Sequence, residues 1–200
     1  DRAIALELNG DFVQLGTIRD AIHRHEEERM IEFDLSFSLQ DGLSLVDPSN
    51  RRNSKITGGE VLKFGGQVGV SRRAPFAKQI AYTLGDFTFA LKARNPEATE
   101  FDLSAASSAG SSASFRFIRQ PGRPWQLPGP IKAYAFPDQA RTFYQNSGFL
   151  ADLEAAYEAA LDRIYYLGPL REFPQRDYLW ARSRPSDVGQ RGEKAIDAIL

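Results

Sequence analysis

The stretch "MIEFDLSFSL", residues 30–39, carries the clearest structural signal in the chain. Its apolar residues stand at every odd position from Ile31 to Leu39 and alternate with acidic residues and serines. Successive side chains of a β-strand point to opposite faces, so this spacing predicts a strand with one buried and one exposed face. Strands of this kind are typical of antiparallel sheets, and we expect the fold to be built on one.

Further strand-like segments follow this one along the chain. Their short length and close spacing predict an antiparallel meander, with a turn at Gly85-Asp86 inside the second segment. Between the first strand and these segments, residues 41–60 are rich in turn-forming residues and are expected to form an exposed excursion. The segments are 61–71, 78–94, 99–105 and 114–119.

The remaining segments add helices to this sheet. Before the first strand we expect a hairpin at Asn9-Gly10 and a helix of about two turns capped by Thr17. After residues 120–137, whose five prolines exclude regular structure, the spacing predicts helices up to residue 164. A strand "YYLG" and a last helix complete an α+β pattern. Three regions are therefore predicted: a β-rich lobe (1–136), a short helical arm (137–164) and a returning segment (165–200).

The composition bounds the function. The net charge of −1 gives no overall field for capturing nucleic acid or acidic membranes, and the lack of cysteine excludes disulfides and thiolate chemistry. No apolar run is long enough to span a membrane. We therefore expect a cytoplasmic protein. Both ends resemble cuts through secondary structure, so the sequence is interpreted as a fragment.

Complete catalytic motifs are missing from the sequence. It contains no GxxxxGK[ST] phosphate loop, no HExxH and no GxSxG, so no catalytic residue is assigned. His23 and His25 are two residues apart and would point to opposite sides of a helix, which disfavours a shared metal. Glu26–Glu28 are interpreted as a solvated face, and the glycines of "FGGQVG" as a bulge or a close backbone approach. No metal ligand is assigned.

The stretch "YYLGPLREFPQRDYLW", residues 165–180, concentrates unusual backbone and charge. Gly168-Pro169 predicts a sharp bend at the end of a strand, from which Arg171 emerges. Guanidinium groups pair well with phosphate oxygens, so Arg171 and Arg176 are candidate nucleotide contacts. The flat rings of Tyr178 and Trp180 would either stack on a base or close the loop onto the core.

Gly189 and Gly192 come immediately before the last helical segment. A glycine turn that leads into a helix N-terminus presents unpaired backbone N–H groups and is a candidate anion site. The alternative is an ordinary helix start in which Glu193 is favourably placed in the first turn.

Two segments resemble one protein family. Residues 166–200, with "YLGPLR" and "VGQRGE", and residues 7–39, with "LGTIRDAI" before the long strand, resemble AAA family ATPases of the ABC-type OLD, RecF and SMC-like group. The resemblance covers about half of the chain. It implies a partial P-loop NTPase head, the part that lies between the Walker A motif and the signature and Walker B motifs.

The resemblance also implies a function. Heads of this group bind ATP and magnesium between paired heads, and many act in DNA repair or phage defence. The lysine, carboxylates and magnesium ligands of those motifs would lie outside this sequence, so the fragment alone is expected to be inactive. By position, Gly168–Arg171 would correspond to the lobe-linking Q-loop. Nucleotide-binding or lobe-linking candidates are Gly168, Pro169, Arg171, Arg176, Gly189 and Gly192.

A different class of function stays open. The same arginines would suit a non-catalytic α+β interaction module that binds an acidic partner or nucleic acid without nucleotide. The flanking sequences discriminate between the two. A phosphate loop before Asp1 and an acidic apolar strand after Leu200 would favour the ATPase head.

Overall fold

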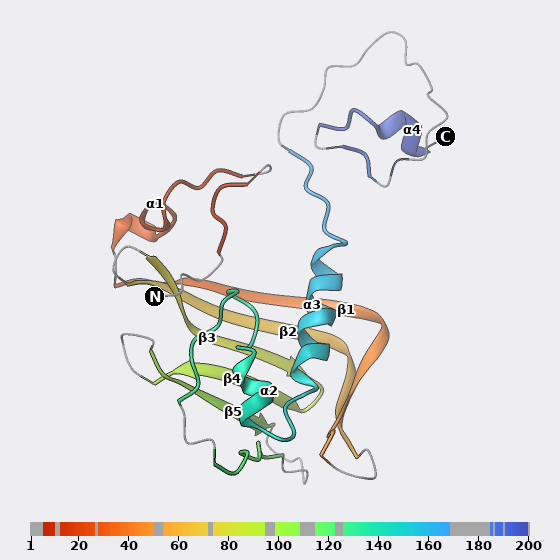
Figure 1. The fold of residues 1–200 in the computed structure, drawn as a ribbon. Helices are drawn as coiled ribbons and strands as arrows, with labels where there is room; N and C mark the ends of the chain where they lie inside the picture. The colour runs from red at the N-terminus through yellow and green to blue at the C-terminus, as the bar shows by residue number, and fades with distance from the viewer. Residues whose placement is uncertain are drawn as a thin grey trace.

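The fold is α+β: an antiparallel sheet carries helices on one face, with a short helical segment beside the start of its first strand (Figure 1). Strands with one apolar face must bury that face, and the helices supply the cover. The described helices are too short and polar to cross a membrane. The computed structural model describes residues 6–10, 13–26, 28–49, 54–71, 74–94, 99–108, 115–122, 126–168, 185, 187–189 and 191–199.

The sheet is a five-stranded meander in which each strand pairs with its neighbour in sequence. Every pairing is antiparallel, as the alternation in residues 30–39 predicts. Gly85, with φ +56°, makes the tight turn between the third and fourth strands, so the predicted turn is also confirmed. The strands are β1 (Ile31–Val46), β2 (Lys55–Ser71), β3 (Ala74–Leu84), β4 (Phe87–Ala93) and β5 (Phe101–Ser107).

The first two strands are longer than expected. The β1–β2 register is uninterrupted from Ile31 to Ser38 and resumes at Leu43, so residues 39–42 form a wide bulge. Gly42 has a φ of +64° at this bulge. After it, Leu43 and Leu45 restore the alternation, and Leu45 is fully buried. The predicted exposed excursion is therefore wrong for residues 41–46 and 55–60, which belong to β1 and β2, and a bulge accommodates Asp41 and Gly42.

The predicted strand at 114–119 is also wrong. Its described residues pair with no strand of the sheet, and Arg119 makes only an isolated bridge with Tyr144. The rings of Phe115 and Phe117 instead pack against Phe89 of β4, at centroid distances of 5.9 and 6.3 Å. The alternation of apolar and polar residues in this segment therefore reflects two aromatic rings that face the core, not a strand.

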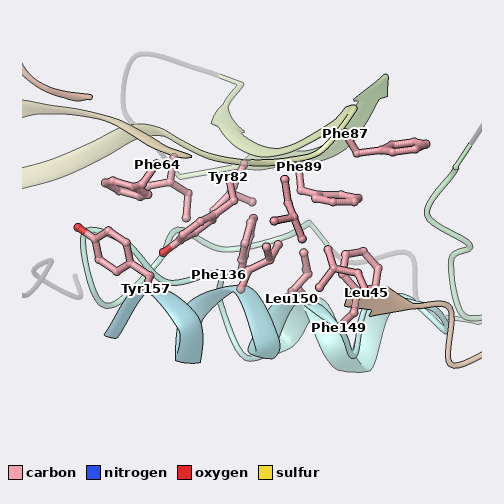
Figure 2. Packing of buried hydrophobic residues seen from close by; sticks show 14 of the residues in the cluster. Leu45, Phe64, Tyr82, Phe87, Phe89, Phe136, Phe149, Leu150 and Tyr157 are labelled. Carbon is pink, nitrogen blue, oxygen red and sulfur yellow. The ribbon is translucent and has the colours of Figure 1, made fainter. Parts of the chain in front are cut away.

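The core lies between the sheet and helices α2 (Gln139–Phe143) and α3 (Leu150–Leu161). Leu150, Leu153 and Tyr157 form the buried stripe of α3, and Figure 2 shows rings from the sheet and from the helical side pointing toward one another. The Tyr157 ring lies 4.7 Å from that of Phe64 and 5.8 Å from that of Tyr82. Sheet and helices thus share one core. The predicted division at residues 136 and 164 stays a prediction.

Polar contacts attach the proline-rich segment to α3. The Tyr134 hydroxyl donates to Glu158 Oε1 at 2.6 Å, and Lys132 Nζ donates to the same oxygen at 2.8 Å. One turn earlier, Glu154 Oε1 accepts from the Phe136 amide at 2.8 Å. The buried Tyr82 hydroxyl donates to the Tyr134 carbonyl at 2.7 Å. These bonds satisfy backbone groups that the irregular segment cannot pair by itself.

The two carboxylates of this network are expected to change stability in opposite directions with pH. Burial raises the pKa of Glu154, which is 17% exposed, above its ordinary value of 4.5. The charged form is therefore disfavoured in the fold, and stability falls as the pH rises from the unfolded pKa through the folded one. Hydrogen bonds from Lys132 and Tyr134 lower the pKa of Glu158, whose contribution is lost as the pH falls through the folded pKa.

We expect Glu154→Gln to stabilise the chain relative to wild type increasingly between pH 4 and pH 7. Glutamine keeps the oxygen that accepts from Phe136 but is not charged at any pH in this range. Urea unfolding at several pH values measures the difference, and Glu158→Gln serves as the control with the opposite slope. Parallel pH profiles for wild type and Glu154→Gln would contradict the assignment.

The N-terminal segment matches its prediction only in part. Thr17 caps a helix through a capping box with Asp20, as expected. However, α1 (Ile18–Ala21) is a single turn, because Ile22 is extended and a 3-10 turn, η1 (His23–His25), follows. The prediction of two continuous helical turns is therefore wrong.

The hairpin before α1 also differs from its prediction. Asn9 pairs with Gln14, so residues 10–13 lie between the paired positions, where a two-residue turn at Asn9-Gly10 was expected. The Asn9 side chain links the two arms on the side away from the turn, since its Nδ2 donates to the Gly16 carbonyl and its Oδ1 accepts from the Gly16 amide, both at 2.8 Å. An Asn side chain can replace backbone pairing in this way, which sequence spacing does not reveal.

Candidate functional site

A hollow of about 370 Å³ lies between the segment that follows α3 and the turn that precedes α4 (Ala195–Ile199). One wall is apolar and aromatic, and the other carries glycine and charged side chains. The first wall consists of Ile164, Tyr165, Tyr166 and Leu167, and the second of Asp187, Val188, Gly189, Arg191, Glu193 and Lys194.

The aromatic wall is not the buried strand that the sequence predicts. Residues 164–168 have no regular secondary structure, and the side chains of Ile164 and Tyr165 are each 61% exposed. Tyr166 and Leu167 are 40% and 41% exposed. A strand requires a neighbouring strand to pair its backbone, and the sheet ends at β1 and β5 without including this segment. The apolar side chains therefore line the hollow.

The opposite wall is a turn stabilised by its own polar groups. Gly189 and Gly192 have φ values of +79° and +80°, a conformation that glycine adopts without strain. The Gly189 amide donates to Asp187 Oδ1 at 2.8 Å, and Lys194 Nζ lies 3.8 Å from the same oxygen. A Cβ at Gly189 would collide with the Glu193 carboxylate. The spacing of the two glycines thus fits a compact turn into α4.

The Glu193 carboxylate takes up backbone amide donors of Arg191 and of its own residue. Its Oε2 accepts from the Arg191 amide at 2.9 Å. Hydrogen bonds from its own backbone and from the Arg191 backbone lower the pKa of Glu193. This arrangement matches the alternative of an ordinary helix start with an acidic first turn. An external anion at this turn would have to displace the carboxylate.

The structure places only some of the predicted site residues. Gly168 ends the segment that forms the aromatic wall, and Gly189 lines the facing wall, so these two parts of the sequence meet around one hollow. Gly192 lies in the same turn as Gly189. Pro169, Arg171 and Arg176 lie outside the described residues, as do Tyr178 and Trp180.

Sequence reasoning overlooked several residues of this hollow. Tyr165 and Tyr166 were expected inside a strand, and Asp187 and Lys194 were not singled out. The run "DVGQRGEK" could have indicated Asp187, because an Asp two residues before a glycine commonly accepts a hydrogen bond from the backbone of a turn. The pairing of Asp187 with Lys194 could not be read from the spacing.

No family model, curated protein or solved structure matches the chain.

Proposed function

We propose that this chain is the central section of an ABC-type AAA ATPase head of the OLD, RecF and SMC-like group. It contributes a β-rich lobe, short helices and an arginine-bearing loop near the nucleotide. ATP and magnesium are bound mainly by flanking segments that carry the Walker A, signature and Walker B motifs. The heads pair with each other, and DNA is a candidate partner.

The observation that carries the proposal is the meeting of two motif segments. "YLGPLR" and "VGQRGE" are separated by 16 residues in the sequence, yet the start of the first and most residues of the second line one hollow. Arg171 ends the first segment and Arg176 lies between the two, both outside the described residues, and we expect their guanidinium groups to contact the nucleotide.

The antiparallel sheet supports the same proposal. The resemblance of residues 7–39 implies a long strand in a β-rich first lobe, and β1 is such a strand in a five-stranded meander. Helix α3 packs on this sheet and continues directly into residues 164–168. One packed helix thus connects the sheet to the start of the first motif segment.

Arg171→Ala is expected to lower ATP turnover about 10²-fold in the polypeptide that carries this chain with its flanks, the effect typical of one charge-stabilising donor. The melting temperature is expected to change little. Arg163→Ala, which removes an exposed arginine at the end of α3, is the matched control and should keep normal turnover. Steady-state hydrolysis and thermal unfolding measure both properties.

Two outcomes would contradict the proposal. Loss of folding with normal turnover per folded molecule would make Arg171 a structural residue. Absence of any ATP binding, together with salt-dependent binding of nucleic acid through the arginine loop, would favour the interaction module.

A further inference from the structure

β1 is an edge strand of the sheet. Within the described residues, the backbone of Ile31–Val46 pairs with β2 alone, so its other side presents N–H and C=O groups to a further strand. From Ile31 to Ser38 the pairing with β2 has no bulge, and this stretch contains no proline or lysine. Bulges, prolines and lysines are features by which proteins commonly block strand addition at a sheet edge.

The apolar face of β1 is incompletely covered. Its inward side chains are only half-buried, whereas Ile80, Tyr82 and Leu84 at the centre of the sheet are at most 1% exposed. Helix α3 contacts this row of inward side chains through an edge-on contact between the rings of Phe37 and Tyr157. Ile31 and Phe33 also pack against the small cluster of Ile18, Ile22 and Val68, and no described strand pairs with β1 on the side away from β2. The half-buried residues are Ile31, Phe33, Leu35, Phe37 and Leu39.

The opposite face of β1 carries two carboxylates that form no ion pair with a described residue, and Lys63 of β2 lies on the same face, diagonal to Asp34. Glu32 and Asp34 are exposed, and no described cation lies within 4.0 Å of either carboxylate. Glu32 accepts a bond from the neutral amide of Gln67 at 2.9 Å. Asp34 lies opposite Gly65, which has no side chain that could form a hydrogen bond or ion pair with it.

A hollow of about 350 Å³ adjoins these two carboxylates on the same face. Gly65 and Ala81, small residues on β2 and β3, form its floor, and Asp34 stands at its β1 end. A long side chain from an added strand can meet Asp34 at this end, while Lys63 lines the hollow on β2. Lysine and arginine have this reach together with the complementary charge.

We propose that β1 is the docking edge for an extended strand of a partner polypeptide in which apolar residues alternate with lysine or arginine. The partner's apolar residues extend the Phe33, Leu35 and Phe37 row beside α3. Its basic residues pair with Glu32 and Asp34 at the open edge. Backbone bonds supply affinity, and the two carboxylates select a basic strand over an acidic one.

A second copy of this chain fits the edge less well. The outward residues of its own β1 are acidic residues and serines, with no base to meet Glu32 and Asp34. Pairing of two such strands would add two more carboxylates and no basic residue to this face, so it gains no charge complementarity.

The test uses the 200-residue chain and a blocked nonapeptide in which valine alternates with lysine or arginine. We expect saturable binding by fluorescence anisotropy, with amide shift changes concentrated at residues 31–38. A matched peptide with glutamate in place of the basic residues should not bind. Asp34→Lys should weaken binding at least about tenfold, because attraction becomes repulsion. Asp162→Lys, a charge reversal at the far end of α3, should leave it unchanged.

Circular dichroism and thermal unfolding of Asp34→Lys establish that the variant folds. Equal affinity for the basic and acidic peptides, or unchanged affinity of folded Asp34→Lys, would overturn the proposal. So would shift changes confined to other strands. Concentration-dependent dimerisation through residues 31–38 without peptide would assign the edge to a second copy instead.

Discussion

Phe89→Ala is expected to destabilise the chain by about 3–5 kcal/mol, the range for removing a large aromatic side chain from a packed core. Phe89 is fully buried on β4. Its ring packs edge-on against Phe149 at 4.9 Å and against Phe115 at 5.9 Å, and it lies 6.0 Å from Phe87. Alanine would leave a cavity where rings from the sheet, from segment 115–119 and from the helical side now meet, and Figure 2 shows Phe87, Phe89 and Phe149 among them.

Urea unfolding measures this change through the midpoint and the slope. Lys92→Ala is the matched control, since Lys92 lies on the same strand with its side chain exposed. That change should stay within about 0.5 kcal/mol. A Phe89→Ala effect below about 1 kcal/mol would contradict the position of this ring at the centre of the core.

Asn146→Ala is expected to cost about 2–4 kcal/mol through the loss of two buried hydrogen bonds. Asn146 is 1% exposed. Its Nδ2 donates to the Arg116 carbonyl and its Oδ1 accepts from the Ile118 amide, both at 2.9 Å. The side chain thus serves segment 115–119 as a strand neighbour would. Alanine would leave these backbone groups without their partner.

Hydrogen exchange separates this role from simple packing. The Ile118 amide should lose protection in Asn146→Ala even in conditions where the protein stays folded, because its acceptor is removed. Gln145→Ala, which alters the exposed neighbouring side chain, should preserve both stability and Ile118 protection. Retained protection at Ile118 in Asn146→Ala would show that another group satisfies the amide.

The two hollows show what kind of site information the sequence contains. The glycines and arginines of the C-terminal segment stand out by composition, and Gly168 and Gly189 do come near one hollow. The sequence predicts Glu193 as a residue of the first helical turn. In the structure its carboxylate also accepts a hydrogen bond from the Arg191 amide, a donor of the candidate anion site. The hollow beside Asp34 arises from Gly65 and Ala81, small residues on two strands that only register aligns. Such alignment depends on contacts distant in sequence.

The sequence itself determined three features: the alternation of residues 30–39, the turn at Gly85 and the Thr17 cap. Each depends on local backbone preference or on the two-residue period of side chains along a strand. Tertiary structure decided the other features. These are the length of β1 beyond its bulge, the absence of strands at 114–119 and 165–168, and the single turn of α1. An apolar alternating segment becomes a strand only where a neighbour offers backbone partners. Phe115 and Phe117 meet the core and Tyr165 meets a hollow. Whether such a neighbour exists is a property of the assembled fold.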